Sequence, residues 1–217
     1  MRAVIFDLWD TLVLWSSEGH SEQLARAASQ VGIEPEALRR AFEDTHRERS
    51  VGPLLENVRT VLHTLGADGA HAETIVGVRR DHTRSVLVPR EGALETLEEL
   101  GRRGLKRGLI SVCSSDVEDV WDETALAREF DDVVLSCSVG MRKPDAEIYL
   151  LSCERLGVES RDCLFVGDGA NDELAGAERV GMKAVCILRP GADEALWPEA
   201  RGWEPTIRDL PAVLDLL

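Results

Sequence analysis

Short apolar runs alternate with helical patterns over most of the chain, and this alternation limits the fold more than any other feature of the sequence. Runs rich in β-branched residues predict strands at 2–6, 108–112, 133–136, 163–166 and 184–188. The expected helices lie at 91–103, 117–130, 145–156 and 172–180, with a short closing helix at 205–217. Alternating strands and helices favour a parallel sheet that carries helices on both faces. The sequence therefore predicts an α/β fold with a doubly wound parallel sheet.

Residues 15–87 interrupt this alternation. The segment is charged, is rich in Ala, Leu, Glu and Arg, and shows helical apolar spacing throughout. Its pattern predicts four helices, at 21–31, at 34–49, from Pro53 and after His71. Because the segment is too long for a simple crossover between two strands, we expect a separate unit. The predicted organisation is a Rossmann-like core, residues 1–14 and 88–217, with an inserted four-helix cap, residues 15–87.

Charge and cysteine usage exclude several classes of function. The formal net charge of −15 argues against non-specific nucleic-acid binding and against docking on an anionic membrane. An anionic small-molecule substrate stays compatible, because local charges or a metal outweigh the net field within a site. The five cysteines are dispersed, and no apolar stretch is long enough for a membrane span or a signal peptide. We expect a cytoplasmic protein, and no oligomeric state is predicted.

Candidate site residues, most of them polar, lie at the carboxyl ends of the first four predicted strands. The candidates are Asp7 and Trp9 after the first strand, Ser111 and Val112 at the second, Lys143 after the third, and Asp168, Asn171, Asp172 and Glu173 after the fourth. Because the carboxyl ends of parallel strands meet at one edge of a sheet, we expect these residues to converge. Ligands bind at that edge in open α/β sheets, so the sequence predicts a site there.

The types of residue in this group indicate phosphoryl chemistry. Clustered carboxylates repel one another unless a cation joins them, and hard oxygen ligands suit Mg²⁺. A carboxylate such as Asp7 can attack phosphorus and form an acyl phosphate. Lys143 and Mg²⁺ would neutralise charge on the transferring group, and Ser111 with nearby backbone N–H groups would hold its oxygens.

The order of these residues resembles that of the haloacid dehalogenase (HAD) superfamily of hydrolases, over nearly the whole chain. By this resemblance Asp7 is the nucleophile, Ser111 the phosphate-binding hydroxyl of the second motif, and Lys143 the lysine of the third motif. Asp168 and Asp172 correspond to the acids that hold Mg²⁺. The resemblance also implies the subclass in which a helical cap is inserted between the first and second motifs.

Two positions of the motifs leave alternatives open. Asp172 and Glu173 are adjacent, so we expect one of them to contact the metal, and the spacing of the family favours Asp172. Asn171 is either a further ligand or a cap of the following helix. Val112 stands where the family commonly has Asn, although its backbone N–H remains available to a phosphoryl oxygen.

Trp9 departs from the pattern of the family's phosphatases, which usually carry an acid/base aspartate at this position. Tryptophan cannot replace that proton transfer, although the Trp9 carbonyl can still bind Mg²⁺ and its ring can shape the pocket. On an extended backbone the next residue, Asp10, would point the other way, although a turn could change that. The loss matters most for poor leaving groups and least for acyl phosphates.

Three functions follow from these residues. The first is a Mg²⁺-dependent phosphatase that acts on a small phosphorylated metabolite through an aspartyl phosphate. The second is a 2-haloacid dehalogenase, because those relatives also lack the aspartate and usually have Tyr in its place. The third is a binding or regulatory protein of the same fold. The cap would select the substrate, with Arg39 and Arg40 either recognising an anion or lying on the solvated surface.

Overall fold

Six parallel strands form one sheet in the order β3-β2-β1-β4-β5-β6 in a computed structural model that describes all residues, 1–217. The strands are β1 (Ala3–Phe6), β2 (Lys106–Ser111), β3 (Asp132–Leu135), β4 (Cys163–Gly167), β5 (Lys183–Ile187) and β6 (Thr206–Ile207). Every neighbouring pair is parallel, and β1 lies at the centre between β2 and β4. The predicted Rossmann-like parallel sheet is therefore confirmed.

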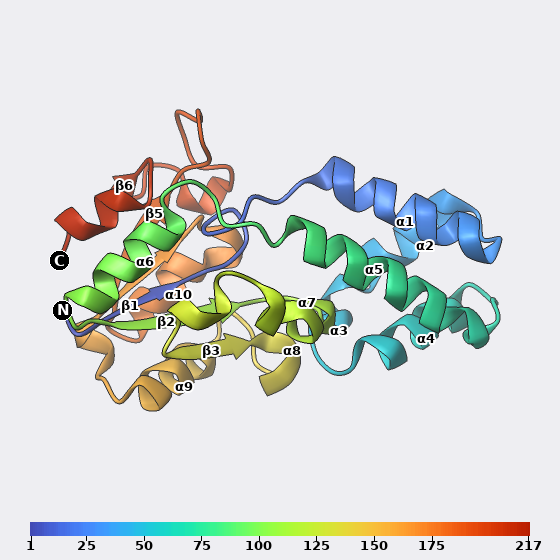
Figure 1. Cartoon of the computed structure of the whole chain (residues 1–217), viewed down its shortest axis with the longest axis horizontal. Coiled ribbons are helices and arrows are strands. Elements are labelled where there is room, and N and C mark those ends of the chain that lie inside the picture. Colours follow the sequence, from blue (N-terminus) through green and yellow to red (C-terminus); the bar gives the residue numbers. More distant parts are fainter.

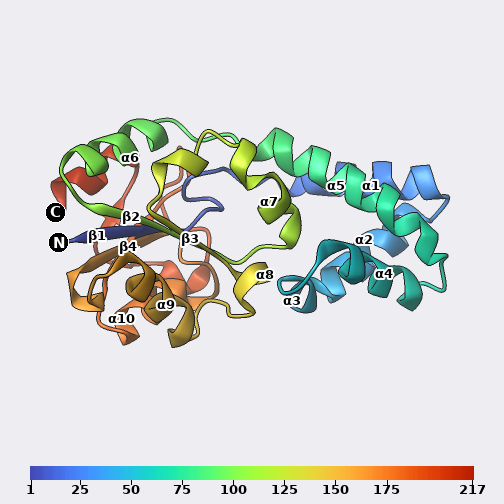
Figure 2. The ribbon, with the colours of Figure 1, turned by 60° about the horizontal axis from the view of Figure 1, so that its bottom comes forward.

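Helices cover both faces of this sheet. They are α6 (Ala93–Arg102), α7 (Ser115–Val120), α8 (Ser136–Val139), α9 (Ala146–Leu156) and α10 (Glu173–Arg179). Figure 2 shows α6 and the C-terminal segment on one side of the strands, with α9 and α10 on the other side. This arrangement is the doubly wound one, and it buries the strands from both directions.

The central strand β1 supplies apolar side chains to two separate hydrophobic clusters. Val4 and Phe6 pack in the cluster that includes Leu97 of α6, whereas Ile5 packs in the cluster that includes Ile148 of α9. Successive side chains of a strand point to opposite faces, so an uninterrupted apolar run is what a strand covered on both faces requires. The run ends at residue 7, where the chain leaves the sheet.

Residues 17–86 fold into a helical block beyond the carboxyl ends of the strands (Figure 1). Its helices are α1 (Ser17–Val31), α2 (Pro35–Asp44), α3 (His46–Arg49), α4 (Leu54–Thr64) and α5 (Ala72–Val86). Helices α1, α2, α4 and α5 surround a third hydrophobic cluster, to which the residues of the sheet do not contribute. The division of the chain into a cap and a core at residues 14/15 and 87/88 stays a prediction.

Several elements differ from their predicted bounds. The predicted helix 34–49 is broken at Thr45, whose hydroxyl donates a 2.5 Å hydrogen bond to the Ala41 carbonyl and competes with the helical ladder. The predicted helix 117–130 forms only α7 and two short 3₁₀ segments. The predicted closing helix 205–217 contains the edge strand β6 and a 3₁₀ segment, Pro211–Asp215.

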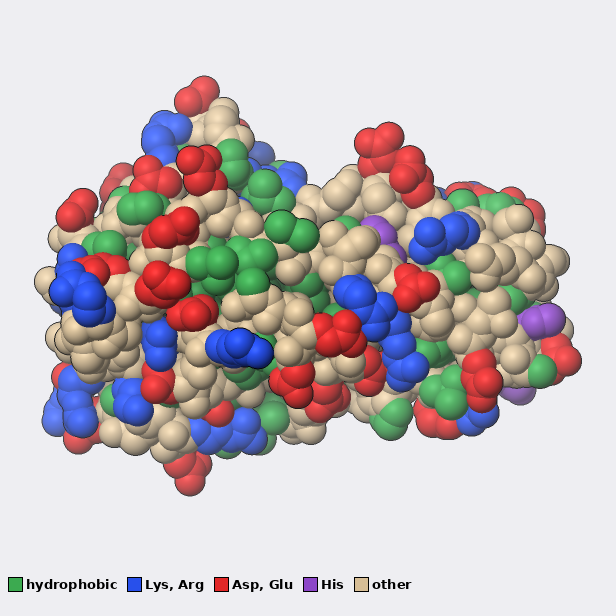
Figure 3. Space-filling view, in the orientation of Figure 1, with side chains coloured by type: hydrophobic (Ala, Val, Ile, Leu, Met, Phe, Trp, Pro, Cys, Tyr) green, Lys and Arg blue, Asp and Glu red, His purple; other side chains and the backbone are tan.

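The loop between α3 and α4 joins the helical block to the sheet side. Gly52 donates a backbone hydrogen bond to the Cys137 carbonyl at 3.1 Å, and the Ser136 hydroxyl donates one to the Ser50 carbonyl at 2.9 Å. The two parts appear as two lobes in Figure 3, and acidic and basic side chains are interspersed on the face shown. No helix in the structure combines the length and the apolar character needed to cross a bilayer.

Candidate active site

Asp7 lies directly after β1, at the centre of the sheet edge that faces the helical block. Its backbone N–H donates a 2.9 Å hydrogen bond to the Val166 carbonyl of β4, which fixes the position of the chain at this residue. The side chain is buried and forms part of the lining of a pocket. The sheet therefore holds a carboxylate rigidly where a small ligand has access to it.

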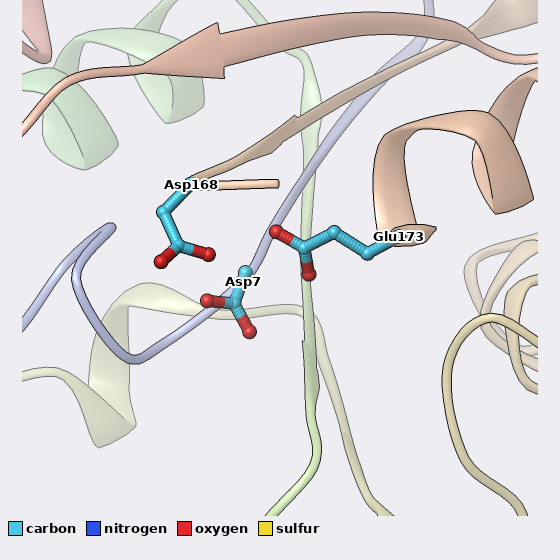
Figure 4. Close-up of side chains that lie close together, drawn as sticks. All are labelled: Asp7, Asp168 and Glu173. Carbon is cyan, nitrogen blue, oxygen red and sulfur yellow. The ribbon is translucent and has the colours of Figure 1, made fainter. Parts of the chain in front are cut away.

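Two further carboxylates lie beside Asp7. Asp168 follows β4, and Glu173 is the first residue of α10. Figure 4 shows the three side chains pointing toward one another, and one carboxylate oxygen from each lies within 4.8 Å of the others. All three are buried, so their charges are poorly screened by water. Such a group of hard oxygen donors is suited to a divalent cation.

Lys143, in the loop between α8 and α9, contacts two of these carboxylates. Its ammonium group donates hydrogen bonds to Asp7 Oδ1 and, at 2.5 Å, to Glu173 Oε2. Burial alone would lower the pKa of Lys143, but the charges of Asp7 and Glu173 outweigh that effect and raise it. The lysine therefore stays positively charged at any physiological pH.

Full ionisation of the three acids would leave excess negative charge in spite of this lysine, because three carboxylates would face one ammonium group. Burial raises the pKa of Asp7, although Lys143 lowers it in part. Burial and repulsion from Asp7 raise the pKa of Asp168 to about 6. Burial likewise raises the pKa of Glu173, with Lys143 opposing and Asp7 adding to the rise. A bound divalent cation would relieve this repulsion, so the donor set fits a metal.

The structure does not bring Asp172 into this group. Its side chain is exposed, and its backbone is left-handed with φ of 56° just before α10 begins. Asn171 has the same backbone conformation, with φ of 55°, and is also exposed, although it borders the pocket. The role of Asp172 as a metal ligand stays a prediction, and Glu173 is the acid that faces Asp7 and Asp168.

Ser111 and Val112 occupy the end of β2 and the start of the loop that follows it. Val112 lines the pocket, whereas the Ser111 side chain is fully buried and is not part of the lining. The Ser111 hydroxyl has no hydrogen-bond partner within the protein. An unpaired buried hydroxyl is costly, so a ligand oxygen that reached it would gain a hydrogen bond at little desolvation cost.

Trp9 lines the pocket and packs edge-on against Trp15, with ring centroids 5.4 Å apart. The neighbouring Asp10 is held in a turn with φ of 55°. Its carboxylate pairs with Arg189 at 2.8 Å and accepts a 3.0 Å hydrogen bond from the Trp15 backbone N–H. Asp10 is therefore engaged in holding the loop after β1 in place.

Trp197 contacts the acidic group from the loop that follows β5. Its indole Nε1 donates a 2.6 Å hydrogen bond to Asp168 Oδ2, and the residue forms part of the pocket lining. Sequence reasoning missed this residue, because the loop carries no motif and lies far from residue 168 in the chain. Its effect is to fix the direction of one carboxylate oxygen.

The pocket has a volume of about 300 Å³ and lies between the strand ends and the helical block. The helical block contributes side chains that were not predicted from the sequence, including His20, Gln23, His46, Arg49, Arg79 and His82. Arg39 and Arg40 are not among them: both pair with Glu36 along α2. Of the two hypotheses for these arginines, a place on the solvated surface agrees with these contacts better than recognition of an anion in the pocket.

A family model described as haloacid dehalogenase-like hydrolase matches residues 1–181 of the chain. The chain belongs to this family. The predicted membership of the HAD superfamily and the predicted hydrolase activity are thereby confirmed. Within this HAD-family hydrolase, Asp7, Lys143 and Asp168 are brought together at the sheet edge as expected.

Relatives of this HAD hydrolase include two kinds of enzyme. The glyceraldehyde 3-phosphate phosphatase of Methanopyrus kandleri is 28% identical over 200 residues, covering 87% of this chain and 84% of the relative. The (S)-2-haloacid dehalogenase 4A of Burkholderia cepacia is 29% identical, covering 88% and 84%. The crystal structure of a HAD phosphatase from Thermococcus onnurineus is 25% identical, with a TM-score of 0.71 over 100% of this chain and 97% of that chain.

Proposed function

We propose that this HAD hydrolase is a Mg²⁺-dependent phosphatase that acts on a small phosphorylated metabolite with Asp7 as its nucleophile. The observation that carries the proposal is the buried group of Asp7, Asp168 and Glu173, in which three carboxylates face the single ammonium group of Lys143. Displacement of a halide needs no metal, whereas an excess of buried carboxylates is explained by a divalent cation. The pocket of about 300 Å³ suits a small substrate.

In the proposed reaction, an Asp7 carboxylate oxygen attacks phosphorus, and the bond from phosphorus to the leaving oxygen breaks. Water then attacks the resulting aspartyl phosphate, which releases inorganic phosphate and restores the Asp7 carboxylate; the proton that the water loses balances the one that the leaving oxygen takes up from solvent. Lys143 contacts Asp7 and stays protonated, so it places a fixed positive charge beside the transferring group. We assign the remaining phosphoryl oxygens to the Ser111 hydroxyl and the Val112 backbone N–H.

The proposed metal site uses Asp7, Asp168 and the backbone carbonyl of Trp9. Bound Mg²⁺ would supply positive charge to the phosphoryl oxygens and relieve repulsion among the acids. For the remaining acid we propose Glu173 in place of the predicted Asp172, because Glu173 is buried beside the other two. Glu173→Gln should then weaken Mg²⁺ binding far more than Asp172→Asn, as measured by isothermal titration calorimetry.

A direct test measures phosphate release from a panel of phosphate esters and acyl phosphates, each with Mg²⁺ and with EDTA. We expect turnover only with Mg²⁺ and none from Asp7→Asn, whose fold is checked by its circular dichroism melting curve. Phosphate release that survives EDTA or the Asp7→Asn substitution would contradict the proposal.

Trp9 supports a second candidate, a 2-haloacid dehalogenase. The residue replaces the expected acid/base aspartate, and Asp10 is held by Arg189 and Trp15. Halide leaves without a proton, so such a site would lose nothing by this replacement. Chloride release from 2-chloropropionate in EDTA, without phosphate release from any ester in Mg²⁺, would establish this activity in place of the first.

A further inference from the structure

Two buried arginines form part of the pocket wall on the side of the helical block. Arg49 comes from α3 and Arg79 from α5, and their side chains are nearly inaccessible to solvent. Both guanidinium groups lie beside the ring of Phe42, with their Cζ atoms 4.4 Å and 5.2 Å from its centroid. The packing of three helices thus places two cations around one aromatic ring at the pocket.

Only one carboxylate forms an ion pair with either of these two arginines. Asp116 of α7 pairs with Arg79 at 3.0 Å and also accepts a 2.6 Å hydrogen bond from the Thr83 hydroxyl. Arg49 instead donates to two neutral acceptors, the Thr45 hydroxyl and the Phe42 carbonyl. Arg49 therefore forms no ion pair, and the adjacent acid Glu48, whose charge it also feels, is exposed to solvent.

The pKa values are consistent with this imbalance. Burial and the neighbouring Arg79 lower the pKa of Arg49 to about 10, which still leaves it charged near neutral pH. Burial opposes ionisation of Asp116, yet Arg79 and the hydrogen bonds of Asp116 hold its pKa below the usual value. The wall thus contains two arginine cations and one carboxylate anion, and burial makes the unbalanced charge costly.

Arg79 adds an independent observation. Its Nη2 atom reaches Asp116 and, at 3.1 Å, the Ser114 hydroxyl, but its Nε and Nη1 atoms are buried without any acceptor. Buried donors that lack a partner destabilise a fold, and arginine is seldom left in this state. A ligand with acceptor oxygens would satisfy them, so both the charge and the hydrogen bonding point to an anion.

The three histidines of this wall do not supply the missing partner. His20, His46 and His82 line the same pocket, and burial together with the nearby arginines lowers the pKa of each. They are therefore neutral near pH 7 and provide ring nitrogens without charge. Recognition of charge in this wall depends on the arginines.

A purely structural role, in which these arginines hold the helical block against the sheet side, explains less. Two other arginines of α5 already form exposed ion pairs across this boundary, Arg80 with Asp119 and Arg84 with Glu123. Arg49 forms no ion pair across it, although it is buried at the pocket. A structural role also gives no reason for the unpaired donors of Arg79.

We propose that Arg49 and Arg79 bind a carboxylate of the substrate, so that this hydrolase selects small phosphorylated carboxylic acids. That this substrate also carries a phosphoryl group rests on the function proposed above. A carboxylate carries the one negative charge that the wall lacks, and it offers acceptor oxygens to the unpaired donors. A pocket of about 300 Å³ accommodates a molecule with both groups on a short carbon chain.

The first experiment compares phosphoglycolate with its amide, phosphoglycolamide, which keeps the size but loses the charge. We expect kcat/KM to be at least about tenfold higher for the acid, because the amide leaves the arginine charge unpaired. Equal kcat/KM values for the two compounds would overturn the inference while leaving the proposed phosphatase activity intact.

The second experiment uses variants of the wall. Arg49→Met should raise KM for phosphoglycolate and leave KM for the amide nearly unchanged, so that the preference disappears. Arg79→Met combined with Asp116→Asn tests the second arginine without leaving a lone buried carboxylate. Arg80→Met is the matched control, because it removes an exposed arginine of the same helix together with its ion pair to Asp119. A preference that survives in both test variants contradicts the proposal.

A binding measurement separates this inference from the proposed function. Isothermal titration calorimetry with phosphonoacetate and phosphonoacetamide reads the same discrimination without turnover. If no phosphate ester is hydrolysed in Mg²⁺, the phosphatase proposal fails, and tighter binding of phosphonoacetate that disappears in Arg49→Met still supports the carboxylate site. Equal binding of the two compounds by the wild-type protein overturns the site, whether or not the enzyme is active.

Discussion

The indole N–H of Trp197 donates a 2.6 Å hydrogen bond to the Asp168 carboxylate, which links a loop after β5 to the acidic group at the end of β4. This contact holds Oδ2 of Asp168, while Oδ1 accepts a 3.1 Å hydrogen bond from the Ala170 backbone N–H. The Asp168 side chain held in this way points toward Asp7 and Glu173 (Figure 4). Trp197 is thus a positioning residue for the proposed metal site, although it does not contribute a ligand atom.

Trp197→Phe should weaken Mg²⁺ binding by about 10–100-fold, because the substitution keeps the ring but removes the donor that orients Asp168. Titration of the protein with Mg²⁺ by isothermal calorimetry measures this change. Trp203→Phe is a matched control, since its indole N–H bonds to the Ala184 carbonyl at 3.3 Å, away from the acids. Equal losses in the two variants would assign the effect to general packing.

Trp9→Asp should accelerate hydrolysis of substrates whose leaving groups need a proton. The gain should be about 10²–10⁴ in kcat/KM for ethyl phosphate and much smaller for acetyl phosphate, whose leaving group departs unprotonated. Steady-state phosphate release measures both, and Trp9→Phe controls for the loss of the indole. Similar gains on the two substrates would show that another group already transfers the proton.

Lowering the pH should destabilise the protein in part through His20. Burial and the charges of Arg79 and Arg49 lower its pKa from 6.5 to about 4, so the unfolded chain binds a proton in this interval before the folded one does. The associated stability is complete above pH 6.5 and is lost as the pH falls toward 4. The unfolding free energy, measured in urea, should fall between pH 7 and pH 5 in both proteins. The fall should be about 1–2 kcal/mol smaller in His20→Gln than in the wild type. In the control variant His63→Gln, which replaces an exposed histidine, the unfolding free energy should fall by as much as in the wild type.

Gly176→Ala should disturb the loop that carries Lys143. A Cβ at this position would lie 2.7 Å from the Tyr149 hydroxyl and 3.0 Å from the Pro144 carbonyl, so the loop or α10 must shift. We expect a loss of about 1–3 kcal/mol in unfolding free energy and a lower kcat. Gly77→Ala on α5, where the added methyl group meets no atom within 4 Å, should instead be neutral or slightly stabilising. Unchanged kcat in Gly176→Ala would show that the loop tolerates the shift.

The convergence of the main site residues could be predicted from the sequence, because the carboxyl ends of parallel strands meet at one edge of the sheet. Asp7, Lys143 and Asp168 follow three different strands, and the order of those strands is enough to bring them to one edge. The choice between Asp172 and Glu173 was less accessible. It depends on the left-handed turn at Asp172, after which α10 starts and directs Glu173 back toward Asp7.

The arginines of the pocket wall lay beyond sequence reasoning. Helical periodicity identifies a buried face, but it does not say which residues of other helices meet that face. Arg49 and Arg79 are brought together by Phe42, a residue of a third helix. Arginine is also usually solvated, so the sequence alone gave no reason to prefer these two over Arg39 and Arg40, which are paired along α2.

The separate hydrophobic cluster of the helical block has an evolutionary consequence. The apolar side chains that stabilise α1, α2, α4 and α5 against one another are not those that stabilise the sheet. Mutations in the helical block can therefore accumulate and alter the pocket wall without displacing Asp7 or Lys143. Descendants of such a protein could therefore change the substrate that they accept through mutations in the helical block. The reaction catalysed at the sheet edge would be preserved.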